Sequence, residues 1–245
     1  MTAVWVGLTV LIGLQIAYPL ASSTGLVIAT VLCGFLLSVG HAWVTRGRRT
    51  ALILVAVTTV GGLLAEAVGV ATGVPFGRYE YTGTLGPELI GVPLVVPLAW
   101  TWMAWPAWLA AGRLVPGWWR IPVGAVALAS WDLFLDPQMV AAGHWRWHHP
   151  VPGLPGVPEV PLSNYLGWLA VALGLMALLD ALVGDPGRGA DAVPVGLYLW
   201  TYGSSVLAHA AFFGLLGSAV WGALGMGLVA IPLANRLRRP VEVRT

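Results

Sequence analysis

The sequence predicts an all-α fold, a polytopic bundle of about eight transmembrane helices in the cell (plasma) membrane. Hydrophobic residues make up 58% of the 245-residue chain and charged residues only 9%, with a mean hydropathy of +0.83. Soluble domains carry about 25% charged residues, so a chain this poor in charge is expected to lie in a bilayer. Its apolar runs also reach the roughly 20 residues that a helix needs to cross the hydrocarbon core.

These runs follow one another along the whole chain, and they predict a single membrane domain over residues 1–245. They lie at about residues 3–20, 25–44, 51–71, 94–112, 121–140, 165–183, 193–214 and 217–235. The core is expected in two repeated halves, about 51–112 and 121–183, with accessory helices in 1–44 and 193–235.

The arginines of the connecting segments predict the orientation of the bundle. With eight spans and a cytoplasmic N-terminus, the positive-inside rule is satisfied and the C-terminus is cytoplasmic as well. The arginines expected on the inside are Arg46, Arg48, Arg49, Arg113, Arg120, Arg188, Arg236, Arg238 and Arg239. Only Arg78 and Arg146 fall outside, in two long loops.

Those two loops, about 72–93 and 141–164, each follow an acid in an apolar helix, Glu66 and Asp132, which lie 66 residues apart. The loops are rich in Gly, Pro and aromatic residues. Irregular backbone at membrane depth is tolerated only where it is buried in protein or lines a wet cavity. We therefore expect re-entrant or lid loops and an internal parallel repeat. The alternatives are interfacial loops with an aromatic belt, and convergent composition.

The intramembrane acids are the first candidates for chemistry, because a charged side chain in lipid is costly. Asp132 and Asp136 are one helical turn apart and share a face. A carboxyl in a low-dielectric site can stay protonated near neutral pH and act as a general acid. The structural alternative is that Asp136 caps a backbone break at Pro137 while Asp132 pairs with Arg78 or Arg146.

Aromatic and polar side chains could complete such a site. Indole faces stabilise cations and pack against flat conjugated chains, which favours the tryptophans beside the acids. Tyr198, Tyr202, Ser205 and His209 form one polar stripe at helical spacing. This stripe would either line a water-holding cavity or make hydrogen bonds between helices.

Other features exclude several classes of function. The net charge is +2 and no basic patch indicates nucleic-acid binding. The lone Cys33 excludes an intramolecular disulfide and a cysteine metal cluster. Five histidines in total, including His144, His148 and His149, are too few for a many-histidine di-iron site. The pair Asp132 and Asp136 is similar to one magnesium motif of membrane prenyltransferases, but a second aspartate-rich motif is missing. No metal or other cofactor is expected.

Two longer motifs resemble a known family. They are Ala65-Glu66-Ala67-x-Gly69-x-x-x-Gly73-x-Pro75-Phe76-Gly77-x-Tyr79-x-Tyr81, and Asp132-Leu133-Phe134-Leu135-Asp136-Pro137 with Gly143-x-Trp145 and Pro161-Leu162-Ser163-Asn164-Tyr165-x-Gly167-Trp168. Both are similar to signatures of the membrane carotenoid-biosynthesis family of bisanhydrobacterioruberin hydratase and carotenoid 1,2-hydratase type. The resemblance spans about residues 60–170.

The resemblance implies addition of water to the terminal double bond of a linear (C40 or C50) carotenoid, without a cofactor. We then expect Asp132 to be the general acid, Glu66 to orient or activate water, and Asp136 to tune Asp132. The roles of Asp132 and Glu66 could also be reversed, because the sequence does not fix which acid donates the proton. Expected substrate-binding residues are Tyr79, Tyr81, Trp100, Trp131, Trp145, Trp147, Asn164 and Tyr165. Expected supporting polar residues are Arg78, Glu80, Arg146, Tyr202 and His209.

The implied partners are a membrane-embedded linear carotenoid and the lipid bilayer, with other carotenoid-pathway enzymes as further candidates. Two other functions fit the same residues. A lycopene-type cyclase would begin with the same protonation but capture the cation with a double bond of the substrate. A non-catalytic carotenoid or lipid carrier, or a transporter built on the repeat, would bind without conversion.

Overall fold

The computed structural model describes residues 1–186 and 189–238, and its described part is mainly helical. Arg188 and Arg239 of the basic pattern lie outside these residues. The long helices are α1 (Thr2–Ala21), α2 (Thr24–Leu54), α4 (Val95–Leu114), α7 (Leu162–Val183), α8 (Ala192–Ala211) and α9 (Leu216–Arg238). The shorter ones are the π-helical segment η1 (Val55–Val60), α3 (Gly61–Thr72), the 3₁₀ turn η2 (Gly117–Trp119), α5 (Arg120–Ala129) and α6 (Asp132–Ala141).

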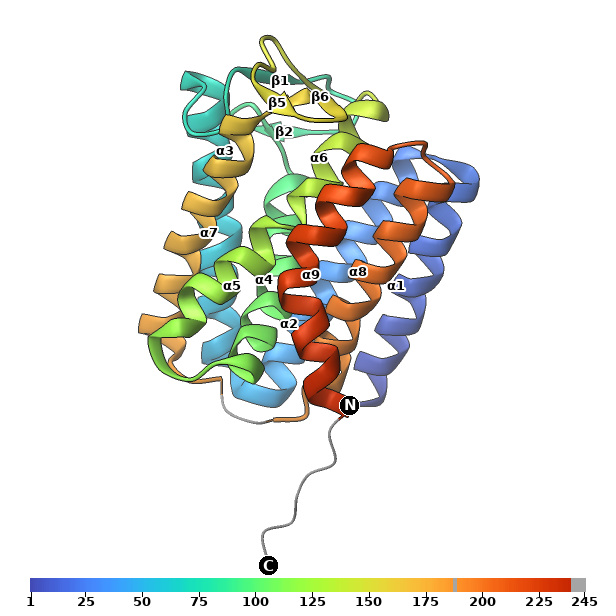
Figure 1. Cartoon of the computed structure of the whole chain (residues 1–245). Helices are drawn as coiled ribbons and strands as arrows, with labels where there is room; N and C mark the ends of the chain where they lie inside the picture. The colour runs from blue at the N-terminus through green and yellow to red at the C-terminus, as the bar shows by residue number, and fades with distance from the viewer. Residues whose placement is uncertain (187–188, 239–245) are drawn as a thin grey trace, which may run out of the picture.

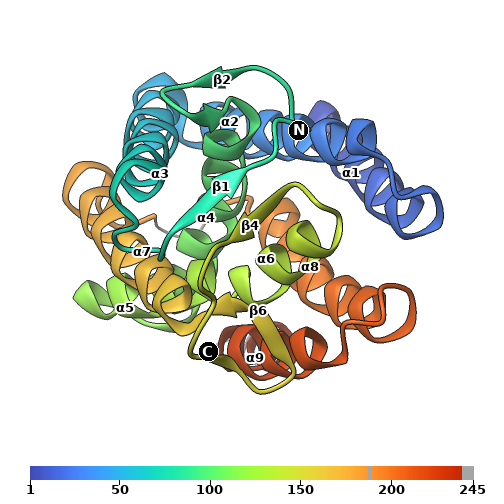
Figure 2. The same cartoon turned by 90° about the horizontal axis from the view of Figure 1, so that it is seen from above.

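Helix α4 lies at the centre of the bundle, surrounded by the other helices (Figure 2). It packs against α2, α5, α8 and η1, and most of its residues are buried. Trp100, Trp105 and Trp108 are among its fully buried side chains. A central helix that is apolar on every side is what a buried position requires.

Within residues 1–186 and 189–238, four helical stretches are long and apolar enough to cross a membrane, by length and composition: Thr2–Ala21, Thr24–Thr72, Leu162–Val183 and Leu216–Arg238. The second of these is broken at Gly47, whose φ of 82° and ψ of 170° are accessible to glycine. This break separates the helices predicted at 25–44 and 51–71. The helices predicted at about 3–20, 25–44, 51–71, 165–183 and 217–235 therefore lie within these four stretches.

The prediction of one continuous helix over 121–140 is wrong. The structure interrupts it at Ser130 and Trp131 and forms two helices, α5 and α6. Within α6, Pro137 has no N–H to donate to the carbonyl of Leu133. The hydroxyl of Ser218 donates to that carbonyl instead, at 2.6 Å. The short helix α6 is thus anchored to α9 and carries its two aspartates beneath the loops.

The two long loops lie together at one end of the bundle, opposite the N-terminus (Figure 1). Their strands are β1 (Tyr79–Tyr81), β2 (Glu88–Leu89), β3 (Val92–Pro93), β4 (Trp145–Trp147), β5 (Gly153–Leu154) and β6 (Val157–Pro161). β2–β3 and β5–β6 are hairpins, one in each loop. β1 and β4 join the loops as an antiparallel ribbon, with Tyr79 opposite Trp147 and Tyr81 opposite Trp145.

The other end of the bundle is held by ion pairs between helix ends and connections. Asp191, which precedes α8, bonds to Arg46 at 2.6 Å and to Arg113 at 2.9 Å. Burial alone would raise the pKa of Asp191, but the hydrogen bonds from Arg46 and Arg113 outweigh burial and lower it below its ordinary value. Arg120 pairs with Asp180 and with Asp185, both at 2.8 Å.

Candidate functional site

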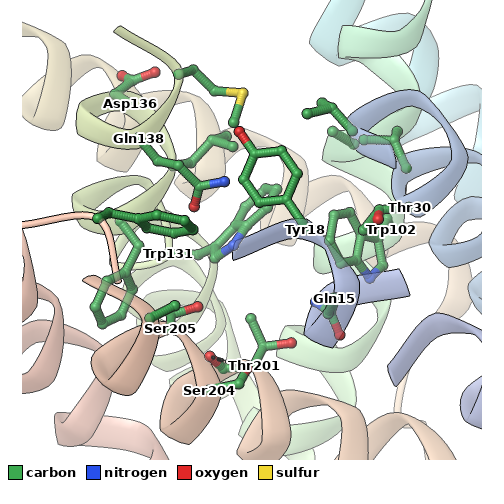
Figure 3. Close-up of a pocket in the computed structure, with 18 of the residues that line it drawn as sticks. Gln15, Tyr18, Thr30, Trp102, Trp131, Asp136, Gln138, Thr201, Ser204 and Ser205 are labelled. Carbon is green, nitrogen blue, oxygen red and sulfur yellow. Dashed lines mark hydrogen bonds between the residues drawn. The ribbon is translucent and has the colours of Figure 1, made fainter. Parts of the chain in front are cut away.

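A cavity of about 540 Å³ lies beneath the β1–β4 ribbon and extends between the helices. Side chains from α1, α2, α3, α4, α6, α7 and α8 form its walls, and β1 and β4 form its roof. Figure 3 shows the part of the cavity between α1, α6 and α8. The volume lies within the range of about 300–1,000 Å³ that is typical of small-molecule sites.

Glu66 of α3 is buried against this cavity, and three side-chain donors bind its carboxylate. Oε2 accepts hydrogen bonds from the hydroxyls of Tyr79 at 2.6 Å and Tyr81 at 2.9 Å. Oε1 accepts from the indole N–H of Trp100 at 3.0 Å. Burial, together with the negative charge of Glu66, raises the pKa of both tyrosines, so they remain protonated donors. Three donors satisfy an ionised carboxylate without a cation.

The two aspartates of α6 share one donor. The side-chain amide of Asn164 in α7 donates to Oδ2 of Asp132 at 2.7 Å and also to Oδ2 of Asp136. Asp136 lines the cavity, whereas Asp132 is fully buried behind it. Two buried carboxyls this close repel each other when both are ionised, so the arrangement favours one proton held by the pair. Such a pair is a suitable proton donor.

The predicted alternative, in which an arginine pairs with Asp132, does not occur among the described residues. Arg146 lies at the exposed outer face of the ribbon and pairs with Glu80 at 2.5 Å. Arg78 is also exposed, and its backbone carbonyl accepts a hydrogen bond from the N–H of His148. These charged residues therefore lie on the ribbon, away from the cavity.

Indole rings form most of the wall around the acids. Trp100 and Trp168 are stacked, with ring centroids 3.8 Å apart and an interplanar angle of 13°. Trp131 contacts Trp168 and Trp102 edge-on, at centroid distances of 6.3 and 5.3 Å. Trp147 packs on Tyr79 in the roof, at a centroid distance of 5.6 Å. This lining suits a flat conjugated ligand and a transient cation.

The polar stripe predicted on α8 makes mostly interhelical hydrogen bonds. The hydroxyl of Tyr198 donates to the carbonyl of Ala127 and that of Tyr202 to the carbonyl of Ala223. His209 bonds to Gln138 at 3.2 Å and to Ser218 at 2.9 Å. Ser205 is the one member of the stripe among the cavity-lining residues.

The structure brings most of the predicted site residues together. Those that line the cavity are Glu66, Asp136, Tyr79, Tyr81, Trp100, Trp131, Trp145, Trp147 and Asn164. Those that do not line it are Asp132, Tyr165, Arg78, Glu80, Arg146, Tyr202 and His209. The hydroxyl of Tyr165 is buried and has no hydrogen-bond partner in the described structure.

Several cavity residues are not identified by the sequence patterns. The polar ones are Gln15, Tyr18, Thr30, Gln138, Thr201 and Ser204. Two sequence signals could have identified some of them. Thr201, Ser204 and Ser205 recur at helical spacing on α8, and Gln15 is a lone amide in an apolar helix. Within the described ranges, no group of three or more His, Cys, Asp or Glu side chains has the arrangement of a metal site.

These features define a helical membrane protein whose acidic site is enclosed by aromatic rings. The sequence profile of the family described as "Carotenoid biosynthesis protein" matches residues 24–232, and the chain belongs to this family. The chain is also 36% identical over 141 residues to bisanhydrobacterioruberin hydratase of Haloarcula japonica. That alignment covers 54% of this chain and 45% of the relative, so the chain matches less than half of the relative's length. No solved structure matches the chain.

Proposed function

We propose that the protein is a cofactor-independent carotenoid hydratase, a hydro-lyase that adds water to the terminal double bond of a linear C40 or C50 carotenoid. The main supporting observation is that one aromatic cavity contains two acidic groups in different environments. Asp132 and Asp136 share one amide donor, which favours a retained proton, whereas Glu66 accepts three hydrogen bonds. Family membership and the similarity to a named hydratase support the same conclusion.

The reaction begins with transfer of the proton of the aspartate pair to the less substituted carbon of the terminal double bond. The π electrons form the new C–H bond and leave a tertiary carbocation. Asp136 is the residue that transfers the proton, because it lines the cavity and Asp132 does not. Asp132, the donor expected from the sequence, lies behind Asp136 and shares that proton with it before the transfer. The faces of Trp100 and Trp168 and the charge of Glu66 stabilise the cation.

Water then attacks the cation, forms the C–O bond and loses a proton, so that the product has gained one H and one OH. The ionised aspartate pair takes up this proton, directly or by way of Glu66, and so returns to its starting state. Thr201, Ser204, Ser205 and Gln138 give the cavity a polar side that can hold the water. The buried hydroxyl of Thr201 has no protein partner in the described structure, so it is available to a water molecule. This polar lining favours hydration over cyclisation, which needs a dry pocket.

The test is expression of Asp136→Asn, Asp132→Asn and Glu66→Gln variants in cells that supply a linear carotenoid. Loss of a general acid or base lowers a rate by about 10²–10⁴-fold, so each variant should give little hydrated product. Glu88→Gln is the matched control, because Glu88 is exposed on β2 and does not line the cavity. Mass spectrometry separates the functions, since hydration adds one water and cyclisation leaves the mass unchanged. Wild-type yields from all three acid variants, or no conversion by purified wild-type protein, would contradict the proposal.

We also propose eight spans, cytoplasmic termini and an internal parallel repeat that relates about 51–112 to 121–183. The pairing of β1 with β4 supports the repeat. In the repeat, Tyr79 corresponds to Trp145 and Tyr81 to Trp147. In the ribbon, Tyr79 pairs with Trp147, which is the counterpart of Tyr81, and Tyr81 pairs with Trp145, which is the counterpart of Tyr79. A two-fold relation between the halves produces such crossed pairing around the central residues Glu80 and Arg146.

A further inference from the structure

The cavity has an exposed side, and that side is confined to one seam of the bundle. The exposed residues that line the cavity are Ile16 and Leu20 of α1, Gly203 and Leu207 of α8, and Phe212 after α8. Every lining residue from α2, α3, α4, α6, α7 and the ribbon is buried or half-buried. The cavity therefore opens sideways between α1 and α8 rather than through its roof.

Two contacts between the walls of this seam define a window. The indole N–H of Trp200 in α8 donates to Oε1 of Gln15 in α1 at 3.0 Å. Nearer the loop end, the rings of Tyr18 and Phe213 meet edge-on at a centroid distance of 5.8 Å. Gly203 follows Trp200 by one turn on α8 and has no side chain to fill the space. Figure 3 shows Gln15 and Tyr18 of α1 across this part of the cavity from Thr201, Ser204 and Ser205 of α8.

The surface around the window is apolar. The exposed fractions are 51% for Ile16, 72% for Leu20 and 60% for Leu207. On helices of membrane length, large apolar side chains this exposed face lipid tails rather than water. A ligand that is itself dissolved in the bilayer can therefore reach the cavity without crossing water.

We propose that the protein binds a linear carotenoid by one end through this window, with the rest of the polyene chain remaining in the bilayer. This inference rests on the proposed function, because it takes a linear carotenoid as the substrate. A conjugated polyene is a stiff rod long enough to extend across much of a hydrocarbon core of roughly 30 Å. Such a rod cannot coil inside the cavity, so when its end reaches Asp136 the remainder leaves along a straight path. The exposed seam between α1 and α8 is that path.

The consequence is that the protein recognises the end group of the carotenoid and not the length of the polyene chain. Two linear carotenoids with the same end group and different lengths should be converted with similar kcat/KM. Each end of a symmetrical substrate is processed in a separate binding event, so a product hydrated at one end should appear before the product hydrated at both.

The experiment uses the full chain in liposomes, with C30 and C50 linear carotenoids that share one end group. The test variant is Gly203→Phe, which places a ring in the window. The control is Gly196→Phe, two turns earlier on nearly the same face of α8 and not among the cavity-lining residues. A Cβ at either glycine meets no atom within 4 Å, so a side chain can begin at either position without a clash. Hydrated product and quenching of tryptophan fluorescence by the bound polyene are both measured.

We expect wild-type protein to convert the two lengths with kcat/KM values within about threefold. Gly203→Phe should lower both conversion and the rate of quenching by about tenfold or more, since an extra ring overpacks the path. Gly196→Phe should match the wild type in both measurements. Normal conversion by Gly203→Phe, equal loss in both variants, or conversion of the shorter carotenoid alone overturns the window. If wild-type protein binds both carotenoids without hydrating them, the proposed function fails, and the quenching rates of the two variants still decide the window.

Discussion

Glu66 has an uncommon environment for a buried acid. No salt bridge involves it within residues 1–186 and 189–238, and its two oxygens are satisfied by two tyrosine hydroxyls and one indole N–H. Neutral donors stabilise a negative charge without neutralising it, so an ionised Glu66 would keep its field in the cavity. An arginine partner would cancel much of that field, and the site would then stabilise a carbocation less.

The two tyrosines that donate hydrogen bonds to Glu66 can be tested by single substitutions. Tyr79→Phe removes the 2.6 Å hydrogen bond and should lower turnover by about ten- to a hundredfold, because a hydrogen bond to a buried charge contributes on the order of 1.5–3 kcal/mol. Tyr81→Phe, which removes the 2.9 Å bond, should have the smaller effect. Turnover of a linear carotenoid by purified variants measures both.

Tyr198→Phe is the matched control for these substitutions. It also deletes a buried hydroxyl, but one that donates to the carbonyl of Ala127 outside the cavity. A loss of turnover equal to that of Tyr79→Phe would show that any buried tyrosine hydroxyl matters, and that the support of Glu66 is not specific.

Individual site residues are partly predictable from the sequence. Glu66 and Asp136 are expected in the site from their types and spacing, and Asn164 from the family resemblance; all three line the cavity. The sequence does not predict that Asn164 bonds to both aspartates, nor that Asp132 lies behind Asp136. Side-chain partners across helices depend on the rotation of each helix, which one apolar pattern does not determine when the helix is apolar all round.

Between elements, glycines create the recesses that hold the rings of the cavity wall. A Cβ at Gly34 of α2 would lie 2.5 Å from the ring of Trp102, and a Cβ at Gly62 of α3 would lie 2.7 Å from Trp100. Small residues let helices and large side chains approach closely in membranes, where packing replaces the hydrophobic effect as the main attraction. The rings of Trp102 and Trp100 therefore occupy spaces that exist because Gly34 and Gly62 have no side chain.

This packing predicts opposite effects for two alanine substitutions on α2. Gly34→Ala should destabilise the protein by about 1–3 kcal/mol, because the buried Trp102 ring has to move. Gly40→Ala should be neutral or stabilising by up to about 1 kcal/mol, because its Cβ meets nothing within 4 Å and alanine favours a helix. Thermal unfolding in detergent measures the difference. Equal melting temperatures for the two variants would show that α2 and α4 adjust without cost.

The sequence predicts the helices better than their interruptions. Apolar runs of membrane length locate the helices because their length is a one-dimensional signal. The break between α5 and α6 has no such signal, since Ser130 and Trp131 are both compatible with an apolar helix. The ribbon is also missed, because pairing of β1 with β4 depends on contacts between segments more than 60 residues apart.

At the scale of the whole molecule, the two ends of the bundle differ in chemistry. Arg46, Arg113 and Arg120 lie at the end that carries the N-terminus, and all three form salt bridges there. The opposite end carries the aromatic ribbon, whose Arg146 is paired with Glu80 on its surface. From this asymmetry, the positive-inside rule predicts that the ribbon, and the acids beneath it, face the outer side of the membrane.

Cysteine labelling tests this orientation directly. In a Cys33→Ser background, Val151→Cys places a thiol on the loop between β4 and β5, where Val151 is 79% exposed. Arg49→Cys places one at the opposite end, where Arg49 is also exposed. A membrane-impermeant maleimide added to intact cells should label Val151→Cys and leave Arg49→Cys unlabelled, and cell lysis should expose both. The reverse pattern would place the acids near the cytoplasmic face, and labelling of both thiols in intact cells would contradict a bundle with these two ends on opposite sides of the membrane.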